Sequence, residues 1–334
     1  MLITKKQIPC PVPRTLDENS FFLCLDTTGL QADVSSITMI GIGFRQGEQL
    51  MLMQWFNESG LEQKDMLISF FDEIAHRQVV ITYYGNRFSL PFLQKKTAEY
   101  GLTNPIDTMI SKDYYDMIYP FRKILSLSSC RQTALEQKIG FKRTISMTGK
   151  KRIQSYQTYL KKKDASTKKA LLLYNEETLL ALWYFSSIPA YPDLKQGKLS
   201  TCGISKKQPA DGKAIFTFSL SLPLLLPLDY TIDDIRLLVT DQYGTLIMPL
   251  DEKDRLKHYY PDVKNYYYLP VEDRAINKSL ASFVPRDYRQ KATWNTCYER
   301  LSFHHPAFQK EDSLKQFLSD VIAWILLERK DGRS

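Results

Sequence analysis

Short apolar runs separated by polar turns dominate the first quarter of the chain and predict a β-sheet. The runs at 21–25, 37–44 and 49–56 have the length of strands, and the short turn at 45–47 between the last two favours an antiparallel meander. Apolar residues over 60–78 recur with the spacing of one helical face. Because this helical crossover leads to the apolar run at 79–83, the fourth strand is expected to run parallel to the first.

Helical patterns follow the fourth strand. Pro91 falls in the first turn of the first of these helices, where a missing backbone N–H is tolerated. Three antiparallel strands, a helix, a parallel strand and then helices predict an α/β domain with a mixed sheet, three antiparallel strands plus parallel strands, flanked by helices. The helices are expected at 88–100, 114–125, 130–139, 153–162 and 166–186.

The composition changes after residue 188 and indicates a second domain. Residues 189–212 hold prolines, glycines and lysines without an apolar period, as expected of a linker. Residues 213–334 then predict a smaller α+β C-terminal domain. Its elements are a strand at 214–222, a hairpin over 235–250 and an amphipathic helix at 312–329.

The chain before the first strand predicts no regular structure. Pro11 and Pro13 each remove a backbone donor and fix the backbone angle φ, so residues 1–19 are expected to form an irregular N-terminal arm. The first domain is therefore predicted to cover 20–188.

The composition favours a globular, cytoplasmic protein. The hydrophobic share of the 334 residues is 43 %, and no apolar run approaches the roughly 20 residues that a membrane helix needs. The N-terminal residues lack the long apolar core of a secretory signal. The five cysteines, including Cys10 and Cys202, are scattered without a CxxC pair, which argues against a zinc cluster or a disulfide framework and fits a reducing cytosol.

A net charge of +8 favours a polyanionic partner, and the basic residues are clustered. Over 142–169 ten lysines and arginines face a single acid, Asp164. Such one-sided clustering is typical of a phosphate-binding face, although a solvated helix face gives the same pattern. The candidate contacts are Lys150, Lys151, Arg152, Lys161, Lys162 and Lys163.

Three motifs occur in order and resemble one family. The first strand delivers Asp26 to a polar Thr-Thr-Gly turn, residues 81–93 read ITYYGNRFSLPFL, and residues 174–178 read YNEET. These frames resemble the motifs of the DEDD 3′–5′ exonucleases, which have a ribonuclease H-like fold. The intervening segments resemble the YprB-type subfamily, and the resemblance covers about residues 20–188.

The resemblance implies a site in which four carboxylates hold two Mg²⁺ or Mn²⁺ ions. The corresponding positions here are Cys24, Asp26, Ser89 and Thr178, so Asp26 is the only acid retained. Tyr174 occupies the position where one branch of the family keeps a tyrosine that orients water. Because Mg²⁺ prefers hard oxygen ligands and thiolates prefer softer metals, no metal cofactor is expected. The chain is therefore predicted to be a bacterial pseudo-nuclease.

The retained surface predicts binding of nucleic acid, single-stranded DNA or RNA, without a membrane partner. Thr27, Thr28, Asn86 and Arg87 would contact the strand beside the basic segment. Two alternatives stay open. One is an active metal-dependent 3′–5′ exonuclease with a rearranged site of Asp26, Asp116 and Glu177, and the other is a protein-interaction scaffold whose basic face binds an acidic protein.

Overall fold

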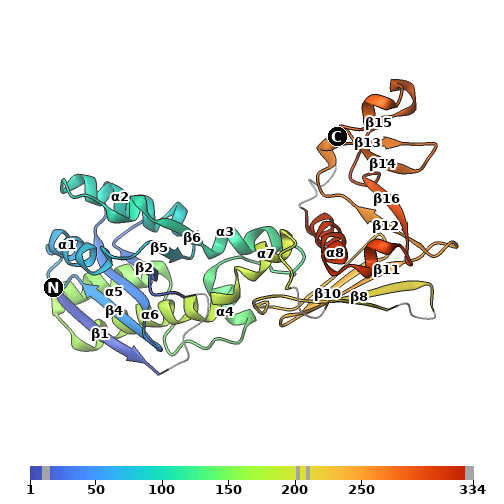
Figure 1. Ribbon diagram of the computed structural model, residues 1–334. Coiled ribbons are helices and arrows are strands. Elements are labelled where there is room, and N and C mark those ends of the chain that lie inside the picture. The colour runs from blue at the N-terminus through green and yellow to red at the C-terminus, as the bar shows by residue number, and fades with distance from the viewer. Residues whose placement is uncertain (10–15, 201–203, 208–210, 328–334) are drawn as a thin grey trace. The chain divides into compact units, whose positions relative to one another are not determined.

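The computed structural model describes residues 1–9, 16–200, 204–207 and 211–327. The chain forms two compact units. The first domain contains Met1–Tyr119 and Ser128–Ser187, and the second contains Pro120–Leu127 and the chain from Ile188 onward. Figure 1 shows the strands and helices of each domain.

A six-stranded mixed sheet forms the centre of the first domain, in the order β1-β4-β3-β2-β5-β6. The pairs β1–β4, β4–β3 and β3–β2 are antiparallel, whereas β2–β5 and β5–β6 are parallel. The predicted mixed sheet, including the parallel pairing of the fourth expected strand with the first, is confirmed. The strands are β1 (Leu2–Ile8), β2 (Ser20–Thr27), β3 (Ile37–Gln46), β4 (Gln49–Phe56), β5 (Val79–Thr82) and β6 (Ile110–Asp113).

The irregular structure expected over 1–19 is wrong for its first part. Leu2–Ile8 form strand β1, which pairs with β4 along its whole length. The pairing covers an edge of β4 whose backbone N–H and C=O groups would otherwise lack partners in the sheet. Pro11 and Pro13 lie outside the described residues.

Strand β6 was not predicted, because its sequence carries no strand signal. Its four residues, ISKD, include two exposed side chains and no continuous apolar run. It pairs in parallel with β5, whose four residues are all buried. An edge strand of this kind is held by its neighbour and not by its own propensity.

Six α-helices accompany this sheet within the described part of the first domain (Figure 1). Helix α1 packs against β3 and β4, and α6 packs against β2, β3 and β4. The helix expected over 114–125 is shorter, because α3 ends at Ile118 and passes into a 3₁₀ turn, Tyr119–Phe121, whose Pro120 lacks the N–H needed to extend the α-helical hydrogen bonds. The helices are α1 (Gln63–Ile74), α2 (Ser89–Glu99), α3 (Tyr114–Ile118), α4 (Gln132–Lys138), α5 (Gly149–Lys162) and α6 (Ala165–Tyr184).

Strand β2 is covered on both faces. Phe21, Leu23 and Leu25 belong to the buried cluster that also contains the apolar residues of α1. Side chains alternate along a strand, so Cys24 and Asp26 point to the opposite face, where α6 packs. The alternation of β2 therefore directs the two polar positions toward α6.

The second domain is β-rich. Its five-stranded sheet has the order β7-β8-β11-β10-β9, and two smaller sheets follow as β12-β16 and β14-β13-β15. The hairpin expected over 235–250 is present as β10 and β11, with Thr240 paired to Tyr243. The strands are β7 (Ser205–Lys207), β8 (Lys213–Ser219), β9 (Leu228–Ile232), β10 (Ile235–Thr240), β11 (Tyr243–Pro249), β12 (Arg255–Tyr259), β13 (Tyr266–Leu269), β14 (Arg274–Asn277), β15 (Gln290–Lys291) and β16 (Tyr298–Ser302).

The segment expected to be a linker, 189–212, is part of the second domain. It contains helix α7 (Ala190–Lys195) and strand β7. Tyr191 is fully buried, and its hydroxyl donates to the Leu226 carbonyl at 2.9 Å and accepts from the Leu226 N–H at 2.8 Å. A few buried apolar residues thus fix a segment whose overall composition resembles a loop. Residues 201–203 and 208–210 lie outside the described part of the chain.

The C-terminal helix α8 (Glu311–Leu326) packs against α7 and β12. Trp324 on this helix stacks on Tyr259 and Trp294, with ring centroids 3.8 and 5.1 Å apart. The predicted end of this helix at residue 329 falls outside the described residues. Across the described ranges, none of the helices has the length and apolarity required to cross a membrane.

A buried histidine should make the stability of the second domain depend on pH. His258 Nε2 lies 3.0 Å from Asp320 Oδ2, and its Nδ1 lies 3.7 Å from Glu299 Oε1. Burial opposes protonation, but the two carboxylates outweigh it and raise the pKa of His258 above its usual 6.5. The charged form is therefore stabilising below about pH 6.5, and this contribution is lost as the pH rises through the native pKa.

We expect His258→Gln to destabilise the protein most at about pH 6 and progressively less toward about pH 9. Urea denaturation followed by tryptophan fluorescence measures the free energy of unfolding of both proteins across this range. The matched control is His304→Gln, because His304 is exposed. A constant difference between wild type and His258→Gln at all pH values would contradict the assignment.

Candidate functional site

Asp26 lies at the end of β2, beside an irregularity in the β2–β3 pairing between Asp26 and Thr27. Its side chain is buried, and both carboxylate oxygens have partners. Oδ2 accepts a hydrogen bond from Asn175 Nδ2 at 3.0 Å, and Oδ1 lies 3.5 Å from Arg152 Nη1. The one acid that the sequence retains is therefore held by an amide and a guanidinium.

Asn175 on α6 is fully buried, and both ends of its side-chain amide are hydrogen-bonded. Its Oδ1 accepts a hydrogen bond from Gln54 Nε2 on β4 at 2.9 Å. Gly41 on β3 leaves the space for this amide, because a Cβ at Gly41 would come within 2.0 Å of Asn175 Oδ1. Asn175, Gln54 and Gly41 were not identified from the sequence as site residues, although Asn175 belongs to the third motif.

Cys24 lies two residues before Asp26, on the same side of β2, and pairs with Gly41 in the sheet. Burial raises the pKa of the Cys24 thiol, and the charge of Asp26 raises it further. The thiol is consequently neutral and a poor ligand for a hard cation. Among the described residues Cys24, Cys130 and Cys297 form no disulfide, while Cys10 and Cys202 lie outside them.

Two arginines stack on the ring of Tyr174, also on α6. Arg152 Cζ lies 4.5 Å and Arg143 Cζ 4.7 Å from the ring centroid. Cation–π contacts at this distance stabilise a buried guanidinium. Burial raises the pKa of Tyr174 even though both arginines oppose the shift, so the phenol is neutral.

Arg143 belongs to a buried ion pair. It donates to both carboxylate oxygens of Glu136, from Nε at 2.7 Å and from Nη2 at 2.6 Å. Its Nη1 donates to Thr178 Oγ1 at 3.1 Å and to the Tyr174 carbonyl at 3.3 Å. Burial opposes the charge, but Glu136 raises the pKa of Arg143. The position where the family keeps a metal-binding aspartate is thus a threonine bonded to a guanidinium.

Glu177 also has a structural role. Its Oε1 accepts from the Thr144 N–H at 2.7 Å and its Oε2 from the Ile145 N–H at 3.3 Å. These bonds hold the segment that carries Arg143 against α6. Neither Arg143 nor Glu177 is adjacent in sequence to the residues that it organises, so no local pattern could have revealed the pairing.

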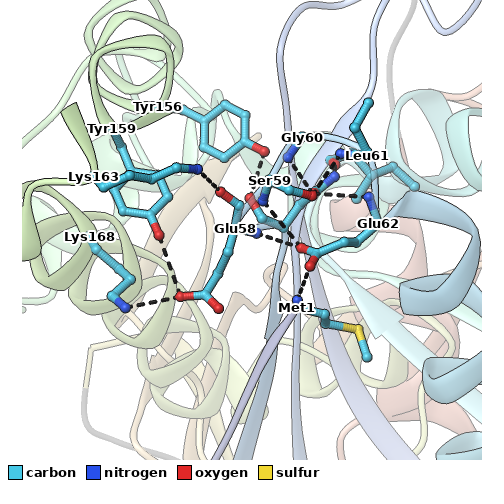
Figure 2. Close-up of polar contacts among 12 residues, drawn as sticks. Met1, Glu58, Ser59, Gly60, Leu61, Glu62, Tyr156, Tyr159, Lys163 and Lys168 are labelled. Atoms are coloured by element: carbon cyan, nitrogen blue, oxygen red, sulfur yellow. Dashed lines mark hydrogen bonds and ion pairs between the residues drawn. The ribbon is translucent and has the colours of Figure 1, made fainter. Parts of the chain in front are cut away.

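Helix α5 carries Arg152 and is anchored on the loop between β4 and α1 (Figure 2). Tyr156 donates to the Asn57 carbonyl at 2.7 Å. Lys163 donates to the Glu58 carbonyl, and Lys168 Nζ lies 3.0 Å from Glu58 Oε1. The contacts of Tyr156 and Lys163 fix the C-terminal half of α5, and Lys168 at the start of α6 holds the same loop. The first turn of α5 thereby presents Arg152 to Asp26.

The same loop is braced internally. Glu62 accepts from the backbone N–H groups of Glu58 and Ser59 and pairs with the amino group of Met1 (Figure 2). Asn57 Oδ1 accepts from the Gly60 N–H at 2.8 Å. A loop with satisfied backbone donors is a rigid support for the helix that it holds.

The lysines on and next to α5 form two groups, apart from Lys142 and Lys169 at the two ends of the basic segment. Lys163 and Lys168 make the internal contacts just described, and Lys163 adopts a left-handed backbone conformation at the end of α5, with φ of 52°. The other group is exposed on one side of α5 and forms no ion pair within the described part of the chain. It consists of Lys150, Lys151, Lys161 and Lys162.

The second motif forms the turn between β5 and α2. Ser89 is buried as the first residue of α2, and within the described ranges it makes no polar contact with Asp26. Asn86 Nδ2 donates to Asp116 Oδ2 at 2.9 Å, and Arg87 pairs with the same carboxylate. Asn86 and Arg87 are exposed, but both side chains already contact Asp116.

Thr27 and Thr28 stabilise the turn that follows β2. Thr27 Oγ1 donates to the Gly29 carbonyl at 2.6 Å, and Thr28 Oγ1 accepts from the Ser36 N–H at 2.9 Å. Both side chains are half-buried. Their proposed contact with nucleic acid stays a prediction.

The residues at this edge of the sheet do not fit a two-metal site. Cys24, Asp26, Tyr174 and Thr178 are brought together by α6 and β2, but Asp26 is the only carboxylate among them. In the residues that the structure describes, no three His, Cys, Asp or Glu side chains are grouped so that they could hold a metal ion. Asp116 and Glu177, the acids of the rearranged alternative, are each bonded elsewhere.

The mixed sheet with helices against its faces is a ribonuclease H-like fold. A family model of the RNase H superfamily matches residues 21–187, which is half of the chain. The chain therefore belongs to the RNase H superfamily, and the fold expected from the three motifs is confirmed. No curated protein matches the chain.

Two solved structures are distantly similar. One is the family B DNA polymerase of Pyrobaculum calidifontis, with 10 % identity over 91 % of this chain and 46 % of the polymerase, and a TM-score of 0.42. The other is E. coli ExoI in complex with single-stranded DNA, with 10 % identity over 94 % of this chain and 75 % of ExoI, and a TM-score of 0.31. The chain spans less than half of the polymerase, and neither score is high enough to carry an argument about function.

Gly41→Ala should displace Asn175 and loosen the site, because the new methyl group would overlap its amide oxygen. Overpacking of this kind typically costs about 1–3 kcal/mol in the free energy of unfolding. Gly43→Ala is the matched control on the same strand, since its Cβ would first meet the end of Leu52 at 3.0 Å. Urea denaturation measures both variants, and equal losses would show that Asn175 is not the limiting contact.

Proposed function

We propose that this chain binds nucleic acid through its first domain and does not cleave it. The observation that carries the proposal is the state of Asp26, whose two oxygens are occupied by Asn175 and Arg152. Two-metal hydrolysis needs several carboxylates at one place to hold both cations. A neutral thiol at Cys24 and a guanidinium-bound hydroxyl at Thr178 cannot supply them.

The exposed side of α5 supports the binding part of the proposal. Its lysines form two pairs, Lys150–Lys151 and Lys161–Lys162, which lie about three helical turns apart and are here called the stripe; the exposed positions between them are uncharged. Because these lysines have no acidic partner among the described residues, their charge is available to a polyanion. A strand of nucleic acid that runs along this stripe would exchange its counterions for lysines.

The three sequence motifs support a more specific proposal about the family to which the first domain belongs. We infer that the chain is a YprB-type member of the DEDD group whose metal site has been lost. It would bind single-stranded DNA or RNA in a bacterial cytoplasm. The rearranged exonuclease is less well supported, because its Asp116 and Glu177 already have partners. The other alternative, a scaffold whose basic face binds an acidic protein, would use the same lysines. The tests below distinguish it from our proposal.

We expect a labelled single-stranded oligonucleotide to remain intact with the protein in Mg²⁺ or Mn²⁺, because the carboxylates that would hold the ions are missing. Denaturing gel electrophoresis measures the strand length over time, with an active exonuclease as the positive control. Metal-dependent shortening that disappears in Asp26→Asn would establish the rearranged enzyme and contradict the proposal.

Replacing Lys161 and Lys162 together by glutamine should weaken oligonucleotide binding and make it less sensitive to salt. Each lost phosphate contact lowers the slope of log K against log salt by about 0.7 for a single strand. Fluorescence anisotropy at several salt concentrations measures both quantities. The matched control is Lys64→Gln with Lys138→Gln, which removes the same charge from exposed positions on α1 and α4. If both pairs behave alike, the stripe on α5 is not the binding face.

A further inference from the structure

The edge of the sheet around Asp26, here called the polar edge, lacks most of the carboxylates expected of a metal site. It contains two arginine guanidinium groups instead. The ion-paired groups of this cluster are Asp26 and Glu136 on one side and Arg143 and Arg152 on the other. Glu177 beside them accepts hydrogen bonds from backbone N–H groups. A metal site of the family type would instead combine an excess of carboxylates with bound cations. In this chain the positive charge is supplied by side chains of its own sequence.

The two arginines are not equivalent. Arg143 is 10 % exposed, and its donors are directed to Glu136, Thr178 and the Tyr174 carbonyl. Arg152 is 31 % exposed, and its one polar partner in the described structure is Asp26, at the long distance of 3.5 Å. Arg152 therefore has N–H groups to offer to a ligand, whereas Arg143 is fully used within the domain.

The position of Arg152 is fixed by independent contacts. Its guanidinium lies over the Tyr174 ring, and α5 is anchored to the Glu58 loop by Tyr156 and Lys163 (Figure 2). A guanidinium that is stacked on one face and anchored through its helix is preorganised for bidentate hydrogen bonds to a phosphate. Lys150 and Lys151 precede it on the same helix, so one strand could contact the stripe and Arg152 together.

We propose that Arg152 replaces the metal ion as the cation that contacts a backbone phosphate of the bound strand at this edge. This inference rests on the proposed function and adds that binding is independent of divalent metal. Asp26 then has the opposite role to a metal-binding carboxylate. It competes with the phosphate for Arg152, and its negative charge repels the strand.

The sign of the effect at Asp26 distinguishes the two kinds of site. In a metal site, Asp26→Asn removes a ligand of the cation and weakens metal-supported binding. Here the same substitution frees Arg152, while an asparagine oxygen can still accept the hydrogen bond from Asn175. We expect Asp26→Asn to raise the affinity for a single-stranded oligonucleotide several-fold.

Arg152→Gln should lower that affinity about tenfold, as expected for the loss of a hydrogen bond to a charged group. In the double variant, Asp26→Asn should no longer raise the affinity, because the cation that it frees is absent. The matched control is Lys150→Gln, an equal loss of charge two residues away on the same helix. Asp26→Asn should retain its effect in the Lys150→Gln background.

The experiment is fluorescence anisotropy with a labelled single strand, in EDTA and in Mg²⁺, on the full chain. Circular dichroism verifies that each variant is folded, and Arg152→Lys serves as a second test, since it keeps the charge but loses the bidentate geometry. Thermal denaturation with Mn²⁺ is a separate readout, in which we expect no increase in Tm. The inference is supported by two results together. EDTA should leave the affinity unchanged, and Asp26→Asn should raise the affinity in the wild-type background but not in the Arg152→Gln background.

The outcomes separate the two proposals. If the wild type binds in a lysine-dependent manner but Arg152→Gln has no effect, or Asp26→Asn weakens binding, the inference about Arg152 is overturned and the proposed function stands. If binding requires Mg²⁺, or Mn²⁺ raises Tm, a metal site exists and the inference is also overturned. If the wild type binds no single strand at all, both proposals fail.

Discussion

Two guanidinium–carboxylate pairs meet on one tyrosine ring, and the polar edge of the first domain depends on them. Glu136 and Arg143 are both nearly buried, so the loss of either would leave an unpaired charge in the interior. Such losses typically cost about 3–5 kcal/mol, much more than the net contribution of an intact pair. The surrounding bonds therefore serve to keep the pairs together, as when Glu177 holds the backbone next to Arg143.

Helix α6 coordinates this arrangement within little more than one turn. Tyr174 supplies the ring, Asn175 the amide that holds Asp26, Glu177 the acceptor for a loop, and Thr178 a hydroxyl for Arg143. Tyr174 and Thr178, four residues apart, lie on one side of the helix, and Asn175 and Glu177 point to either side of them, so the helix makes contacts over much of its circumference. The third motif is consequently a packing element, whatever chemistry its relatives perform.

The sequence was a good guide to the central strands and a poor one to the edges of the sheet. Short apolar runs located β2 to β5, because both faces of a central strand are buried. They missed β1 and β6, which are half-exposed and held by pairing. Charge clustering identified the basic segment but could not assign roles within it. Arg152 and Lys163 contact the rest of the first domain, whereas Lys161 and Lys162 face solvent. That distinction depends on where α5 docks, and long-range contacts with Glu58 and Asp26 decide it.

The buried cluster has a further consequence for the kinetics of binding. Arg143 and Arg152 are each paired with a carboxylate, so the two arginines add little to the electric field that a distant polyanion experiences. That field arises from the exposed lysines, which would control the rate of encounter and its dependence on ionic strength. Arg152 acts only at contact and would control how long the complex persists. Association and residence time are thus assigned to different residues of a single helix.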